Sequence, residues 1–222
     1  MKEYERQRSS AGQFLYRIVL AAFSLFVNGF GVYLTIHANI GAGPWDVFNL
    51  GLSKTFGILY GTASISVSMI ILIIDIAMKE PIGIAMFIDA IVVGKSVDLF
   101  RYLKIIPAPH TLAGSIVMMF AGLFIIGYTQ YFYMKAALGC GPRDTLLVGI
   151  KKRTQSIPIG IVSIIMLSIV TLIGYFLGGP VGIGTLISAF CAGPVMQFAF
   201  TTMHFDATKI HHQSIYELMK GV

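Results

Sequence analysis

The chain of 222 residues is strongly apolar: 56% of its residues are hydrophobic, only 12% are charged, and the mean hydropathy is +0.80. Soluble domains carry about twice this charged fraction, so the composition excludes an ordinary soluble protein. The net charge of +6 comes from Lys and Arg residues that cluster beside apolar runs, which is typical of membrane proteins. We therefore expect the lipid bilayer, with its anionic headgroups, to be the partner, and not nucleic acid.

The apolar residues form runs of about 20, the length that crosses a bilayer as a helix. A polar N-terminal segment (1–16) precedes a first transmembrane half (17–100). A connector (101–110) leads to a second half (111–203) and a polar tail (204–222). The predicted spans cover residues 17–37, 60–78, 82–100, 112–135, 157–177 and 181–203. The first run is longer than the apolar part of a signal peptide and lacks a small-residue cleavage site, so we expect it to be retained.

Two short stretches organise the chain. They are Gly41-Ala42-Gly43-Pro44-Trp45-Asp46 and Gly139-Cys140-Gly141-Pro142-Arg143-Asp144. In each, two glycines permit a sharp turn and the proline suits the first position of a helix. The aspartate then lies in the first turn, where its charge meets the positive end of the helix dipole. Each stretch predicts a break followed by a short helix, the first running from residue 44 to about 56 with Gly57 as its cap.

The similarity of the two halves extends beyond this motif. At a constant shift, with one inserted residue, the matched pairs include Phe26 and Phe124, Gly29 and Gly127, Tyr33 and Tyr131, Gly61 and Gly160, Pro81 and Pro180, and Gly94 and Gly193. We interpret this register as a duplication. The predicted fold is all-α, with two repeats that each hold three spanning helices and one short re-entrant or broken helix after the GxGPxD motif.

Several motifs resemble one known family. They are Gly-x-Gly-Pro-Trp-Asp followed by Gly-Leu-Ser-Lys, then Gly-Pro-Arg-Asp, and Gly-Gly-Pro-Val-Gly-Ile-Gly-Thr before the last span. Together they resemble the bacterial YczE/YyaS/YitT-type membrane proteins, in particular the YczE branch, over nearly the whole chain. The resemblance implies a bacterial inner-membrane protein of duplicated architecture, and it supplies no substrate.

Two topologies agree with the sequence. In the first, the short helices re-enter the membrane and the halves are inverted, which leaves Lys54, Lys95, Arg101 and Lys104 outside. In the second, the short helices cross, each half has four crossings and the halves run parallel, which leaves Lys79, Lys135 and Arg143 outside. Both obey the positive-inside tendency with cytoplasmic termini. A 13-residue helix is short for a bilayer of about 30 Å, and this favours the inverted layout.

In the inverted layout both helix starts face a shared cavity. Free N–H groups and the positive dipole end favour an anionic group there, and an arginine adds a charge-assisted bond. The candidate substrate-binding residues are Gly41, Gly43, Trp45, Asp46, Gly139, Gly141, Arg143 and Asp144. The alternative is that the motifs are only tight turns whose aspartates stabilise helix starts.

Other ionisable residues lie within the predicted spans. Asp89 lies in the middle of a span, where an ionisable group is a functional candidate. Lys95 and Asp98 are three residues apart on one helix face and are expected to pair with each other. Cys140 and Cys191 are far apart in apolar sequence and indicate neither a disulfide framework nor a metal motif, so we expect no cofactor.

Two functional hypotheses follow. The first is a small secondary transporter for a small, anionic or zwitterionic molecule. The second is a non-transporting scaffold that recruits a cytoplasmic partner through residues 151–153 and the tail. The sequence contains no nucleophile elbow, zinc-protease helix or phosphate-binding loop, so we do not expect an enzyme. A homodimer is compatible with either hypothesis for a chain of 24.2 kDa.

Overall fold

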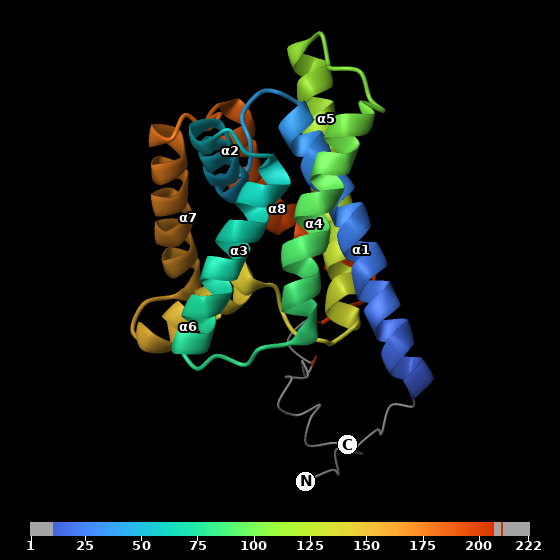
Figure 1. Ribbon diagram of the computed structural model, residues 1–222, viewed down its shortest axis with the longest axis vertical. Helices are drawn as coiled ribbons and strands as arrows, with labels where there is room; N and C mark the ends of the chain where they lie inside the picture. Colours follow the sequence, from blue (N-terminus) through green and yellow to red (C-terminus); the bar gives the residue numbers. More distant parts are fainter. Residues whose placement is uncertain (1–10, 207–209, 211–222) are drawn as a thin grey trace.

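The computed structural model describes residues 11–206 and residue 210, and these residues form helices joined by loops (Figure 1). In chain order the helices are α1 (Ala11–His37), α2 (Pro44–Phe56), α3 (Tyr60–Ala77), α4 (Ile84–Leu103), α5 (Leu112–Lys135), α6 (Pro142–Arg153), α7 (Ile159–Phe176) and α8 (Ile183–Thr202). The all-α prediction is confirmed for this part of the chain. Most of the polar N-terminal segment and of the tail lies outside the described residues.

Five of the described helices are long and apolar enough to span a bilayer, namely α1, α3, α5, α7 and α8. Helix α4 has 20 residues, as many as α8. It is less apolar because it carries Asp89, Lys95, Asp98 and Arg101. The protein is therefore a helical membrane protein with several spans.

The two short helices begin where the Gly-x-Gly-Pro motifs predict. Pro44 and Pro142 open α2 and α6, and Gly57 closes α2 in the left-handed conformation with φ of +65°. With 13 and 12 residues, these helices are each only about 20 Å long. Neither helix is long enough to cross a hydrocarbon layer of about 30 Å.

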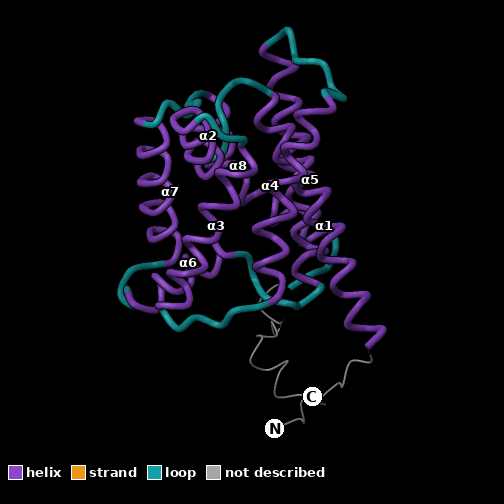
Figure 2. The backbone as a smooth tube through the Cα atoms, in the orientation of Figure 1, coloured by secondary structure: helices purple, strands orange, loops and turns teal. Residues whose placement is uncertain are grey.

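The short helices lie at opposite ends of the bundle (Figures 1 and 2). We name the end that holds α2 the α2 end; it also holds the α4–α5 connector and the α7–α8 turn. The other end, named the α6 end, holds the α3–α4 and α6–α7 turns. Helix α1 begins at the α6 end, whereas α5 begins at the α2 end, so these two helices run in opposite directions (Figure 1).

Two helices extend beyond their predicted bounds. Helix α1 begins at Ala11 rather than near residue 17, because Phe14 adds an apolar side chain that packs against the buried cluster around Leu25 and Tyr133. Helix α4 continues to Leu103 and ends at Lys104, which takes the left-handed conformation with φ of +48°. Glycine is the usual residue for such a cap, so the sequence did not indicate this end.

The core of the bundle is the crossing of α1 and α5, the most extensive helix pair. Helix α4 packs on α1, and α8 packs on α5, while α2, α3, α6 and α7 form a second group joined to the first through α3 and α4. At the crossing, a Cβ on Gly122 would lie 2.7 Å from the Gly31 carbonyl oxygen. Small residues allow this close backbone approach, as in other membrane helix pairs.

Candidate functional site

The first break, residues 38–43, is held by the turn that precedes α8. The Gly184 N–H donates to the Ile40 carbonyl at 2.7 Å. Gly41 has φ of +108°, and a Cβ there would lie 2.6 Å from the Gly182 nitrogen. Non-helical backbone within a membrane protein must be paired in this way, so the break is a built feature of the interior.

The second break, residues 136–141, is held by the turn that precedes α4. The Ala85 N–H donates to the Leu138 carbonyl at 3.1 Å. Gly139 has φ of +116°, and a Cβ there would lie 2.7 Å from the Gly83 Cα. Each break is therefore fixed by the half of the chain to which it does not belong.

A polar side chain from a long helix lies beside the start of each short helix. A Cβ on Gly43 would lie 3.0 Å from Ser188 Oγ of α8, and a Cβ on Gly141 would lie 2.9 Å from Asp89 Oδ2 of α4. No side chain caps either helix start, so the first-turn N–H groups have no such acceptor in the described structure. The glycines leave room for these polar side chains to lie against the backbone of each helix start.

The two helix starts meet through Trp45 and Arg143. The Arg143 guanidinium lies 5.1 Å from the centre of the Trp45 ring, a cation–π contact. Its Nη2 donates to Ser64 Oγ of α3 at 3.2 Å. Residues from α2, α3 and α6 thus converge at one point between the two halves.

Arg143 is the cation of this site, and three aspartates lie near enough for their charges to act on it. Its charge interacts with those of Asp46, Asp89 and Asp144. Among the described residues, however, no carboxylate oxygen lies within 4.0 Å of Arg143. The guanidinium therefore keeps donors available for a carboxylate or phosphate from outside the chain.

The start of α2 contributes further polar groups. The Tyr60 hydroxyl donates to Asp46 Oδ1 at 2.7 Å. Asn49 is completely buried, and neither atom of its amide forms a hydrogen bond within the described structure. Buried polar groups are normally paired, so these residues indicate a polar interior rather than a plain helix start. Asp144, the counterpart of Asp46, is exposed.

A stripe of buried polar residues runs along α3 and was not among the predicted features. Tyr60, Ser64, Ser68 and Asp75 all lie on the buried face of this helix, and both carboxylate oxygens of Asp75 lack a hydrogen-bond partner among the described residues. The spacing of four residues between the first three places them on one helical face. That spacing, together with an aspartate inside an apolar span, was the signal available in the sequence.

The expected pair between Lys95 and Asp98 does not form. Asp98 Oδ1 instead accepts the Gly61 N–H at 2.9 Å and joins α4 to α3, while Lys95 is exposed. The free N–H in the first turn of α3 attracts the carboxylate. Asp98 is thus a helix-packing residue, and Asp89 is the ionisable residue of α4 that lies beside the start of α6.

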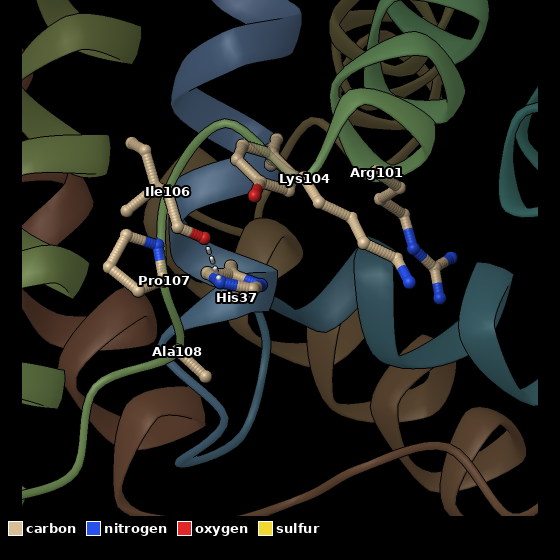
Figure 3. A pocket seen from close by; sticks show the side chains of 7 residues that line it. His37, Arg101, Lys104, Ile106, Pro107 and Ala108 are labelled. Carbon is tan, nitrogen blue, oxygen red and sulfur yellow. Dashed lines mark hydrogen bonds between the residues drawn. The ribbon is translucent and has the colours of Figure 1, made fainter.

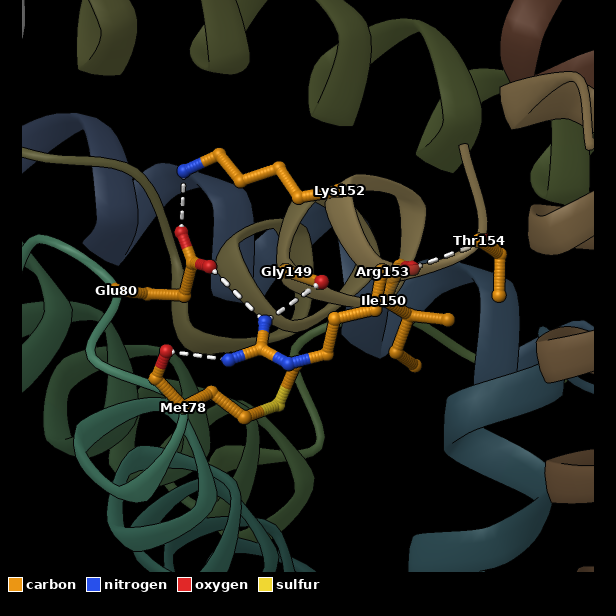
Figure 4. Close-up of polar contacts among 7 residues, drawn as sticks. All are labelled: Met78, Glu80, Gly149, Ile150, Lys152, Arg153 and Thr154. Atoms are coloured by element: carbon orange, nitrogen blue, oxygen red, sulfur yellow. Dashed lines mark hydrogen bonds and ion pairs between the residues drawn. The ribbon is translucent and has the colours of Figure 1, made fainter. Parts of the chain in front are cut away.

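At the α6 end, Glu80 binds the basic residues that close α6 (Figure 4). Its carboxylate lies 2.6 Å from Lys152 Nζ and 3.3 Å from Arg153 Nη1, and Arg153 also donates to the Met78 and Gly149 carbonyls. Two of the three residues that a cytoplasmic partner was expected to bind are therefore engaged within the protein. This weakens the scaffold hypothesis.

The pKa of Glu80 lies below that of an ordinary glutamate. Burial alone would raise it, but the hydrogen bonds and charges of Lys152 and Arg153 outweigh that effect. A carboxylate with a depressed pKa stabilises the fold above its ordinary pKa and loses this contribution as the pH falls through the lowered value. The contact between α6 and the α3–α4 turn is therefore intact at neutral pH and weakens as the pH falls through the lowered pKa of Glu80.

Replacing Glu80 by glutamine is expected to destabilise the protein at pH 7 by about 1–2 kcal/mol, since both cations are half-exposed and solvent screens the pairs. Thermal unfolding in detergent should show a Tm lower by about 3–6 °C. The difference between Glu80→Gln and the wild type should shrink as the medium becomes strongly acidic. The control is Lys151→Gln, because Lys151 bonds only the Gln155 carbonyl among the described residues; an equal loss in both variants would contradict the prediction.

Comparison with known proteins identifies relatives across most of the chain. Residues 15–201 match a family of unknown function, DUF6198. The chain is 32% identical to the uncharacterized membrane protein YczE of Bacillus subtilis, over 79% of this chain and 81% of YczE. It is 29% identical to an uncharacterized protein of Haemophilus influenzae, over 82% of each chain, and 28% identical to YyaS of B. subtilis, over 79% of this chain and 88% of YyaS. No solved structure matches the chain.

Proposed function

Since the chain belongs to the family of unknown function DUF6198, we propose from the site itself that this membrane protein is a small secondary transporter. The substrate is a small molecule with an anionic group, which binds between the starts of α2 and α6. The observation that carries the proposal is Arg143, a cation at the meeting point of two helix starts with no carboxylate within 4.0 Å in the described structure. The site binds and passes its substrate and catalyses no reaction.

The proposed site retains the eight residues of the two motifs. Helix N-termini and glycine backbone suit an anion, and Arg143 supplies the charge that a carboxylate or phosphate needs. Broken helices that point their N-termini at a substrate near mid-membrane are a known plan among transporters. The substrate-binding residues are Gly41, Gly43, Trp45, Asp46, Gly139, Gly141, Arg143 and Asp144.

The proposal includes two inverted repeats, α1–α4 and α5–α8. Support comes from the opposite directions of α1 and α5 (Figure 1) and from the matched backbone of the two breaks. Asn39 and Ala137 have φ of +54° and +53°, and the following Gly41 and Gly139 have +108° and +116°. From the basic residues that end α6 we infer that the α6 end faces the cytoplasm. The start of α1 would then lie on the cytoplasmic side and the α4–α5 connector outside.

A difference between the halves supports alternating access. Helices α3 and α4 pack closely, and a Cβ on Gly94 would lie 2.9 Å from the Gly61 carbonyl oxygen. Their counterparts Gly160 of α7 and Gly193 of α8 have nothing within 4 Å of such a Cβ. In transporters with inverted repeats, each half adopts in turn the conformation that the other half had before. The closed α3–α4 pair and the open α7–α8 pair fit one state of such a cycle.

Cysteines at Gly160 and Gly193 test this exchange. In a background without Cys140 and Cys191, the pair is expected to crosslink only when α7 and α8 close as α3 and α4 do now. The crosslinked protein should then lose transport, and reduction should restore it. Each single cysteine variant is the control. If the double cysteine variant transports fully and never crosslinks under any condition, alternating access by closure of α7 against α8 is contradicted.

Transport itself is tested with purified protein in liposomes on a solid-supported membrane, which records charge movement from a panel of small carboxylates and phosphates. We expect at least one anion to give a current that saturates with concentration. Liposomes without protein and liposomes with Arg143→Gln are the controls. The proposal would be overturned if no anion of the panel gave a current or uptake and if bulky substitutions at Gly43 and Gly141 left the phenotype unchanged.

A further inference from the structure

A cavity of about 370 Å³ lies at the α2 end, away from the proposed transport site (Figure 3). Its walls are the ends of α1 and α4 and the connector between α4 and α5. The side chains that bear on ligand chemistry are Tyr33, His37, Arg101 and Lys104. This volume is at the small end of the range for ligand pockets, which suits a small headgroup or metabolite.

The cavity is basic and holds no acid. Arg101 and Lys104 are exposed, and no carboxylate oxygen in the described part of the chain lies within 4.0 Å of either. Figure 3 shows both side chains extending in the same direction from the end of α4. Two cations without a counter-ion beside one concave surface attract an anion.

Tyr33 supplies a hydrogen-bond donor to this cavity. Only 2% of the residue is exposed, and its hydroxyl is without a partner among the described residues. The ring is held by His37, with centroids 5.0 Å apart, and by Phe100 at 6.1 Å. A buried donor that is fixed in place and unpaired requires an acceptor, and a ligand in the cavity would provide one.

His37 is oriented by the connector. Its Nε2 lies 3.0 Å from the Ile106 carbonyl oxygen (Figure 3). A carbonyl only accepts, so this nitrogen carries the proton. The contact ties the end of α1 to the connector and thereby fixes one wall of the cavity beside the cations.

We propose that this cavity binds a phosphate group, with Arg101, Lys104 and the Tyr33 hydroxyl as donors. A guanidinium binds two phosphate oxygens in a fork, and the ammonium supplies a second positive charge. The phosphate belongs either to the headgroup of an anionic lipid or to a soluble phosphate compound. The inference does not rest on transport, because binding here is measured without it.

The first arm of the test measures binding of inorganic phosphate to the full-length protein in neutral detergent by calorimetry. We expect Arg101→Gln and Lys104→Gly each to weaken binding at least tenfold, since each removes a charged donor, and Tyr33→Phe to weaken it several-fold. Glycine adopts the left-handed conformation of position 104 freely, so Lys104→Gly removes the charge without backbone strain. Lys95→Gln, on the same helix but outside the cavity, is the matched control and should bind as the wild type does.

The second arm distinguishes the source of the phosphate. Protein taken from nanodiscs of phosphatidylcholine with phosphatidylglycerol is examined by native mass spectrometry for retained phosphatidylglycerol. Saturable binding of inorganic phosphate that needs Arg101 and Lys104 assigns the site to a soluble compound. The site is assigned to lipid if the wild type retains phosphatidylglycerol, the Arg101→Gln/Lys104→Gly variant does not, and inorganic phosphate does not bind. If neither ligand depends on these two residues, the proposal is wrong.

Discussion

Replacing Arg143 by glutamine is expected to weaken binding of the anionic ligand between the helix starts by about a hundredfold, since loss of one partner of a buried charge pair costs several kcal/mol. The chain reports on this site directly, because Trp45 is its only tryptophan and lies 5.1 Å from the guanidinium. Titration of small carboxylates and phosphates against Trp45 fluorescence measures the affinity.

Two further variants sharpen this experiment. Arg143→Lys keeps the charge but loses the planar fork, so its affinity should fall between those of the wild type and Arg143→Gln. Arg101→Gln removes an arginine at the separate α2-end cavity and should leave the Trp45 response unchanged. A full Trp45 response in Arg143→Gln would show that Arg143 does not bind the ligand.

Substitution of Gly41 or Gly139 by alanine is expected to prevent normal assembly. Both residues have φ above +100°, and a Cβ at either would collide with backbone atoms of Gly182 or Gly83. Unfavourable φ together with overpacking costs about 3 kcal/mol or more. Size-exclusion chromatography of the solubilised protein should show little monodisperse material, and the remaining fraction should have a lowered Tm.

The chain offers separate controls for the strain of a positive φ and for the steric clash of an added Cβ. Gly57 has φ of +65° but nothing within 4 Å of an added Cβ, so Gly57→Ala should cost only about 1 kcal/mol for the left-handed conformation. Gly193 lies within α8 with open space around it, and alanine there should be neutral or stabilising by up to about 1 kcal/mol. Equal tolerance of alanine at positions 41, 139 and 193 would contradict the role assigned to the breaks.

Local signals in the sequence were sufficient for the helices and the two breaks. The bounds of α2 follow from Pro44 at its start and Gly57 at its end, and apolar runs of about 20 residues predict the spans. The end of α4 could not be predicted in this way, because Lys104 takes a conformation that is usual for glycine. Helix bounds thus follow from residue type only where the cap is a conventional one.

The arrangement of the site depends on contacts between distant residues, and sequence patterns do not contain them. The motifs predicted that Trp45 and Arg143 matter, but only the fold brings them to 5.1 Å. Asp98 bonds to Gly61 and not to Lys95 because α3 and α4 pack together. Glu80, in a turn between spans, gains its role from the end of α6. The cavity beside His37 likewise arises where α1, α4 and the connector meet.

The measurement that tests the account most directly is the sidedness of the α4–α5 connector. A single cysteine at Ala108, and in a second variant at Gln155 of the α6–α7 turn, is placed in a background without Cys140 and Cys191; both positions are exposed. Intact cells are treated with an impermeant thiol reagent. Inverted halves predict labelling at position 108 from outside and labelling at position 155 only after lysis. Protection of both positions in intact cells would mean parallel halves, and the two helix starts would then not share one site.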